Sequence, residues 1–306
     1  MIIASQWQAN LPLAGAVIAL GLYVAGGRRL AGAGGPRRHA GWRTPAFLAA
    51  LAALVLALQP PLDSAVGTYL WAHMVQHLLL LGVAAPLLVA AAPWLQTWRG
   101  LPLGWRRVTA RAIITHRWSA PLRAVARFLA KPGEAWLFFT VGLLAWHLPW
   151  LYDLALRNRV VHDLEHFTFL GFAILFWAQV IDTPPFHSRL NQLQRVAYVL
   201  GAMTVSWVLA LVLVFAAGPI YPYYAAVAST PHVIAGVLSY TDPAGLTALE
   251  DQQLAGGIMW VPGSIPFSVA IFVFLYRWLD DGHPRIGDRE GTDGRSPGRT
   301  STLGGV

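Results

Sequence analysis

Five histidines of the chain occur in positions from which they could bind one metal ion together. His73 and His77 are four residues apart, as are His162 and His166, so on helices each pair shares one face. His147 belongs to a third apolar segment. Imidazole nitrogens bind copper, zinc and iron well, and carboxylates beside them widen the choice of divalent ions. The candidate metal ligands are His73, His77, His147, His162, His166, Asp153, Glu165 and Asp251.

The composition indicates that membrane-spanning helices carry these residues. Of the 306 residues, 56% are hydrophobic and only 12% are charged, and the mean hydropathy is +0.51. Apolar runs near the length of a bilayer-spanning helix alternate with short polar or basic stretches, which favours a helical membrane protein over a barrel. The chain has no cysteine, which excludes disulfides and sites that depend on cysteine ligands.

We predict an all-α, polytopic bundle of about seven transmembrane helices. The membrane domain covers residues 1–279, and residues 280–306 form a disordered tail rich in Gly, Arg, Ser and Pro. Residues 1–10 carry no positive charge, so no cleaved signal peptide is expected. The expected spans are Leu11–Ala25, Thr44–Leu58, Tyr69–Leu95, Glu134–Leu151, His162–Ile181, Arg195–Ala217 and Gly256–Trp278. The basic segment Arg99–Pro132 between them could lie along the membrane surface.

The distribution of basic residues predicts the orientation. Of the 22 Lys and Arg residues, all but Arg157 and Arg159 fall in loops on one side of the predicted membrane or in the tail. Because positive loops stay in the cytoplasm, we predict an N-terminus outside it and a C-terminus inside. The net charge of +8 therefore reflects topology, and no nucleic-acid partner is expected.

In this frame six of the ten histidines lie toward the outer side, five of them in three spans and His232 in the outer loop. A single His pair near a membrane surface is most simply an interfacial polar pair. Two pairs and His147 at similar depth on three helices favour a metal or haem site, because ionisable groups in a span usually mark a functional path. His39, His116, His187 and His283 are expected to be solvated cytoplasmic residues.

Two other patterns keep alternatives open. The sequence from His162 to His166 fits the inverse zincin pattern H-x-x-E-H, in which Glu165 would be the general base of a zinc protease. Facing histidines could instead be axial ligands of haem. Met74 and Met259 could offer soft thioethers, although single methionines in spans usually serve packing. A transporter is disfavoured, because the inner halves of the spans carry almost no ionisable residues.

Several motifs, in the same order along the chain, resemble the multi-span CtaG family of cytochrome c oxidase assembly factors. The resemblance runs from about Tyr69 to Trp278. The first two spans and the tail carry no such motif. The resembling stretches are His73-Met-Val-Gln-His77-Leu-Leu, Ala85-Pro86-Leu87-Leu88, Trp146-His147-Leu148-Pro149, Tyr152-Asp153, Ala155-Leu156, His162-Asp-Leu-Glu165-His166, Phe176-Trp177 and the segment from Asp251-Gln252 to Pro262-Gly263.

The resemblance implies a multi-pass protein of a bacterial plasma membrane that helps to mature a haem–copper oxidase. Its partner would be a nascent oxidase subunit, its surroundings the lipid bilayer, and its cargo a copper ion for the CuB centre. It further implies an assembly factor rather than an enzyme. From the residues alone the metal could be copper or zinc, haem stays an alternative, and a scaffold whose histidines bond only to one another is also open.

Overall fold

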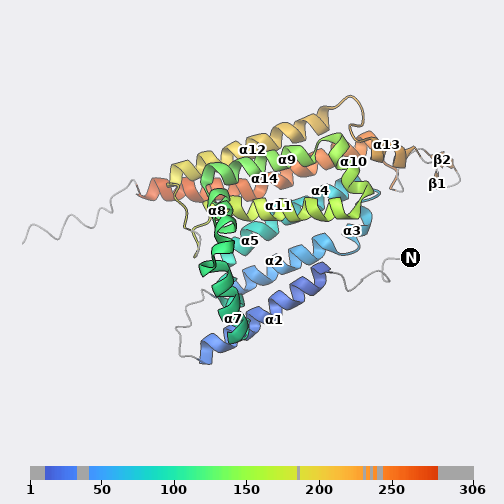
Figure 1. Cartoon of the computed structure of the whole chain (residues 1–306). Coiled ribbons are helices and arrows are strands. Elements are labelled where there is room, and N and C mark those ends of the chain that lie inside the picture. The colour runs from blue at the N-terminus through green and yellow to red at the C-terminus, as the bar shows by residue number, and fades with distance from the viewer. Residues whose placement is uncertain are drawn as a thin grey trace, which may run out of the picture.

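The computed structural model describes residues 11–32, 41–184, 187–229, 232–234, 237–239 and 244–281. Helices account for nearly all of them (Figure 1). In chain order the elements are α1 (Leu11–Gly32), α2 (Arg43–Leu58), α3 (Leu62–Ala65), α4 (Leu70–Leu78), the π-helix η1 (Leu79–Ala84), α5 (Ala85–Ala91), α6 (Trp94–Gly100), α7 (Leu103–Ala110), the π-helix η2 (Arg111–Thr115), the 3₁₀-helix η3 (Arg117–Ser119), α8 (Ala120–Leu129), α9 (Pro132–Trp146), α10 (Pro149–Arg157), α11 (Arg159–Val180), α12 (Gln192–Phe215), α13 (Pro222–Ala228), the strands β1 (His232–Ile234) and β2 (Val237–Ser239), and α14 (Ala248–Asp281).

The predicted all-α polytopic bundle is confirmed. Among the described residues, six helices or continuous helical segments are long and apolar enough to cross a membrane, and α9 with the helical segment before it makes up to seven. That preceding segment, 117–129, meets α9 at 82°. Outside the helices, β1 and β2 pair in antiparallel fashion, with His232 opposite Ser239. The tail was predicted to begin at residue 280, but α14 continues to Asp281. The rest of the predicted tail lies outside the described residues.

The predicted span Glu134–Leu151 is wrong in one respect, because the helix does not run through it unbroken. It ends at Trp146, and α10 starts at Pro149. Proline has no N–H to continue the helical ladder, and it drives the preceding residue into an extended conformation. Leu148 accordingly has φ −64° and ψ 129°. His147 therefore lies at a break between two helices.

A second proline shapes the span that carries His73 and His77. The π-helix η1 follows α4, and Pro86 begins the helix beyond it. Pro86 cannot donate a hydrogen bond to the turn before it, which leaves a carbonyl without its usual partner. The indole N–H of Trp177 donates to the carbonyl of Leu81 at 2.9 Å. This bond joins the span to α11, the helix that carries the other histidine pair.

Glycines let two helix pairs approach closely. A Cβ at Gly256 of α14 would lie 2.8 Å from Cγ2 of Val214 and 3.1 Å from the carbonyl oxygen of Ala210. A Cβ at Gly100 would lie only 2.0 Å from the carbonyl oxygen of Leu22, so α6 rests directly on the backbone of α1. By contrast, a Cβ at the next residue, Gly257, would meet no atom within 4 Å.

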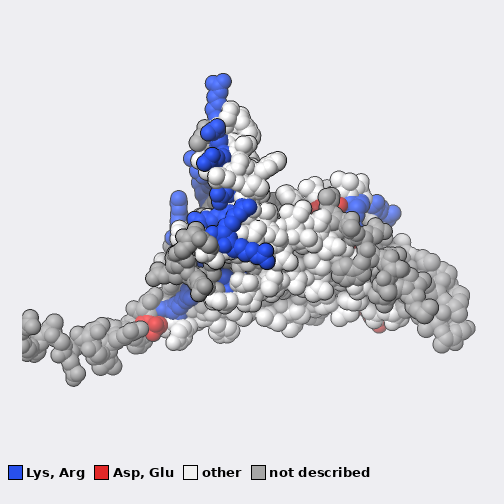
Figure 2. All heavy atoms as spheres, turned by 90° about the horizontal axis from the view of Figure 1, so that it is seen from below, with Lys and Arg blue, Asp and Glu red and all other residues white. Residues whose placement is uncertain are grey.

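The two ends of the bundle differ in charge. Lys and Arg gather on the segment formed by α7 and α8 (Figure 2). In Figure 1 this segment crosses one end of the bundle, whereas α3, α10 and α13 lie at the other. Trp105 and Trp118 of the basic segment are 67% and 60% exposed. Exposed aromatics beside arginines are typical of a helix at a membrane surface. The orientation of the bundle in the membrane stays a prediction.

Candidate metal centre

The start of α4 is held by a carboxylate from another helix. The side chain of Asp251 accepts hydrogen bonds from the backbone N–H groups of Leu70 at 2.7 Å and Trp71 at 2.9 Å. Free N–H groups at a helix start need such partners and favour negative charge. The neighbouring Gln252 donates to the carbonyl of Leu213 at 3.0 Å and accepts from the N–H of Ile220 at 2.6 Å. These two side chains fix α4 and the end of α12 against α14.

Asn158 similarly sets the start of α11. Its side-chain oxygen accepts from the N–H of Val160 at 3.0 Å and of Val161 at 3.4 Å. From this start, residues three and four positions apart fall on one face of the helix. His162, Glu165 and His166 occupy that face and are 6%, 0% and 6% exposed.

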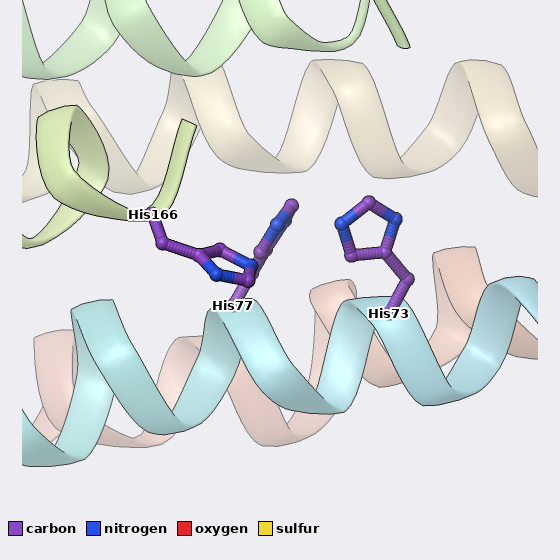
Figure 3. A group of neighbouring side chains, drawn as sticks. All are labelled: His73, His77 and His166. Carbon is purple, nitrogen blue, oxygen red and sulfur yellow. The ribbon is translucent and has the colours of Figure 1, made fainter. Parts of the chain in front are cut away.

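The histidine faces of α4 and α11 meet inside the bundle. Figure 3 shows His73 and His77 rising from α4 while His166 reaches toward them from α11. Ring centroids lie 5.3 Å apart for His73 and His162, and 5.7 Å apart for His77 and His166. Two groups of three residues each bring one ligand atom per residue within 4.8 Å of the others: His73, His77 and His166, and His73, His162 and Glu165.

Glu165 lies between the two histidines of α4. One carboxylate oxygen is 3.6 Å from Nε2 of His73, and the other is 3.5 Å from Nε2 of His77. Both distances exceed those of ordinary hydrogen bonds. Two ligand atoms at about 2.1 Å from a tetrahedral ion are about 3.4 Å apart. The distances from Glu165 to the two rings are thus closer to those between ligands of one metal ion than to those of direct hydrogen bonds.

Eight polar atoms of the histidines and Glu165 lack a hydrogen-bond partner within the described part of the protein. They are buried and make no hydrogen bond there: Nε2 of His73, His77, His147, His162 and His166, Nδ1 of His77, and both oxygens of Glu165. Buried polar atoms normally have partners, and each exception calls for an explanation. Nitrogen and carboxylate donors gathered at this spacing fit a copper or zinc ion.

A family model described as the cytochrome c oxidase caa3 assembly factor matches residues 21–281. The chain belongs to this family. The matched residues include all of the cluster. Two curated relatives, uncharacterized proteins of Mycobacterium bovis and Mycobacterium tuberculosis, are each 27% identical over 285 residues, which are 90% of this chain and 39% of the relative. The chain thus spans about two fifths of their length. No solved structure matches it.

In this member of the family, two of the predicted ligands bind backbone N–H groups. Asp251 supports α4, as described above. Asp153 of α10 accepts a hydrogen bond from the backbone N–H of Tyr223 at 3.4 Å. Neither belongs to the groups whose donor atoms converge. The sequence placed both carboxylates in the right region but could not show that backbone N–H groups bind them.

His147 occupies an intermediate position. Its ring centroid is 6.3 Å from that of His77, and it is outside the two converging groups. Nδ1 of His147 lies 2.8 Å from the carbonyl oxygen of Leu143. A carbonyl only accepts, so Nδ1 carries the proton and Nε2 keeps a lone pair.

The remaining histidines of the family member lie away from the centre or beyond description. His116 is exposed, and His187 is a surface residue whose Nδ1 lies 3.4 Å from Asp182. His39 and His283 lie outside the described residues, and of His232 only its place in β1 is described. Arg159, one of the two basic residues predicted to lie on the outer side, forms ion pairs with Asp63 at 3.0 Å and Asp163 at 2.9 Å.

The sequence reasoning missed the part played by Tyr152. Its hydroxyl lies 2.6 Å from Nδ1 of His73, and the side chain is fully buried. The residue stands five positions after His147, in a segment expected to end the span. A tyrosine near a predicted helix end normally indicates the membrane interface. The available signal was its place within a family motif.

Proposed function

We propose that the protein binds a copper ion in transit at His73, His77, His162, His166 and Glu165, and delivers it to a nascent haem–copper oxidase subunit to form its CuB centre. The family membership supports a role in oxidase assembly. The observation that carries the metal site is the set of buried imidazole nitrogens and carboxylate oxygens without hydrogen-bond partners. Copper would supply no chemistry here, because the ion is cargo.

The donor set suits transfer rather than permanent storage. Histidine and carboxylate bind Cu(II) and zinc with borderline preference, whereas a tight Cu(I) trap would use thiolates, and the chain has no cysteine. The predicted orientation puts the cluster toward the outer side, so a subunit that receives copper outside the cytoplasm would meet the site there. In this proposal the partner is the oxidase and the surrounding phase is the bilayer of a bacterial plasma membrane.

The runner-up functions fit the geometry less well. Glu165 is 0% exposed, and its two oxygens face histidines of α4. A general base must come within hydrogen-bond reach of a water beside the peptide. The cavity next to His77 and His147 measures about 60 Å³, whereas sites for cofactors of drug size or larger occupy about 300 Å³ or more. Copper handling therefore takes precedence over a protease or a haem protein.

The decisive experiment is metal analysis with an absorption spectrum of detergent-purified protein. The variant His77→Ala/His166→Ala is compared with wild type, and His116→Ala/His187→Ala serves as a control because those residues are at the surface. We expect stoichiometric copper in wild type and the control, and loss in the first variant. Zinc instead of copper would favour the zinc-protease alternative. A Soret band would favour the haem-binding alternative. Absence of any metal after copper is added back would leave only a scaffold.

A companion measurement connects the site to oxidase assembly. Cells that carry the His77→Ala/His166→Ala variant should contain the folded protein but an oxidase deficient in copper. Cells with the control variant should contain normal oxidase copper. If replacement of all five histidines of the region leaves oxidase copper intact, metal handling is excluded.

A further inference from the structure

A small cavity adjoins the histidine cluster between α4, α9 and α14. It measures about 60 Å³, room for a few water molecules or an ion with its ligands. Each lining helix presents one face to it, with residues three or four apart along α4, α9 and α14. The lining side chains that have a lone pair for a metal ion are Met74, His77, His147, Met259 and Ser206.

The two histidines bring unpartnered nitrogens to this cavity. His77 and His147 are each 6% exposed. Nε2 of His147 and both ring nitrogens of His77 make no hydrogen bond within the described residues. The bond between Nδ1 of His147 and Leu143 fixes the tautomer, which leaves the Nε2 lone pair available to a ligand. Nε2 of His77 faces Glu165, so Nδ1 is the atom left for the cavity.

Two methionines could add soft sulfur ligands to the imidazole nitrogens at this cavity. The chain has only four methionines, and Met74 and Met259 both line this one cavity. Met74 is 3% exposed, so its thioether is removed from solvent. Thioethers are soft ligands that select Cu(I) and contribute little to zinc. Packing alone would not require sulfur beside imidazole nitrogens that have no partner.

We propose that this cavity is a second metal position, selective for Cu(I), with His77, His147, Met74 and Met259 as its ligands. It extends the proposed function and rests on it in taking copper as the cargo. A neutral imidazole has one lone pair. His77 therefore serves either this position or the cluster with Glu165 at any one time, so the two positions compete for this histidine. Only binding is proposed, with no change of oxidation state.

The test loads the purified full chain with Cu(I) under anaerobic conditions and measures X-ray absorption at the copper edge. Wild type should show sulfur scatterers together with nitrogen. Met74→Leu/Met259→Leu should lose the sulfur scattering and bind Cu(I) about tenfold more weakly or worse against a competing chelator. Met203→Leu is the matched control, because Met203 is a buried methionine that does not line the cavity.

Two further measurements keep the outcomes distinct. Zinc binding by Met74→Leu/Met259→Leu reports on the cluster with Glu165 and should match wild type. Wild type labelled with selenomethionine should show copper–selenium scattering, without any variant. Cu(I) bound by nitrogen and oxygen alone, or sulfur scattering that survives in the double variant, would overturn the cavity site. Failure of zinc and Cu(II) to bind would count against the proposed function instead, whatever the sulfur result.

Discussion

The hydroxyl of Tyr152 lies 2.6 Å from Nδ1 of His73 and makes a buried hydrogen bond with that ring. Tyr152 belongs to α10, so the bond joins this short helix to α4. With Nδ1 bonded to the phenol, Nε2 is the nitrogen of His73 that is left to meet a metal ion. Nε2 lies 3.6 Å from a carboxylate oxygen of Glu165. The phenol thus orients the His73 ring toward the cluster.

Replacing this tyrosine should weaken metal binding without removing a ligand. In Tyr152→Phe the His73 ring loses the hydrogen-bond partner of its Nδ1, which orients the ring. Outer partners of metal-binding histidines are typically worth about 10–100-fold in affinity. We expect a loss in that range for zinc or Cu(II), measured by competition with a chelator. Tyr223→Phe is the control, since Tyr223 donates to Gly67 instead of to the cluster; an equal loss in both variants would refute the role given to Tyr152.

The variant Asp251→Asn tests whether Asp251 stabilises the start of α4 or binds the metal ion. The amide has one oxygen, so one of the two N–H groups at the start of α4 loses its acceptor. We expect a destabilisation of about 1–2 kcal/mol, seen as a lower thermal midpoint in detergent. Below the midpoint the metal stoichiometry should equal that of wild type. Asp280→Asn, an exposed acid at the far end of α14, should leave both properties unchanged. Loss of metal by folded Asp251→Asn would restore Asp251 as a ligand.

The sequence was sufficient for the parts of the fold and centre that depend on periodicity. Two His pairs spaced by four predict shared helix faces, and apolar runs predict the spans that carry them. Their convergence needs two helices to pack side by side; similar depth in the membrane favoured it, but depth alone does not determine which helices are neighbours. Asp153 and Asp251 show the limit: a carboxylate predicted as a metal ligand can bind backbone N–H groups instead. Tyr152 meets His73 across 79 positions of the chain, a contact without local signature.

The hydrogen bond from Trp177 to the carbonyl of Leu81 predicts that the effects of replacing Trp177 and Pro86 on stability depend on each other. Trp177→Phe keeps the aromatic ring in the core but leaves the Leu81 carbonyl without this donor. An unsatisfied buried acceptor costs about 1–3 kcal/mol, so the thermal midpoint should fall clearly. The control Trp118→Phe removes an indole that is 60% exposed and should have little effect. If Pro86→Ala is combined with Trp177→Phe, the restored backbone N–H should recover part of the loss, and no recovery would contradict the account of η1.

The ion pair between Asp182 and Arg195 predicts a pH-dependent stability at the arginine-rich end. Nη2 of Arg195 is 3.3 Å from the carboxylate, which is 47% exposed. Partial burial raises the pKa of Asp182, but the hydrogen bond from Arg195 and other contacts outweigh it, and the net pKa lies below its ordinary value.

A carboxyl whose pKa is depressed by folding stabilises the protein above its unfolded pKa of about 3.9 and loses that contribution as the pH falls through the folded value. Asp182→Asn should therefore unfold at a lower temperature than wild type at pH 7. Because the group is half exposed, the difference should be at most about 1 kcal/mol. It should shrink below about pH 4, where wild type also loses the charge. Asp163→Asn, whose carboxylate lies at the opposite end of the bundle, is measured in parallel. A difference for Asp182→Asn that stays constant from pH 7 to pH 3 would show that the ion pair is not its cause.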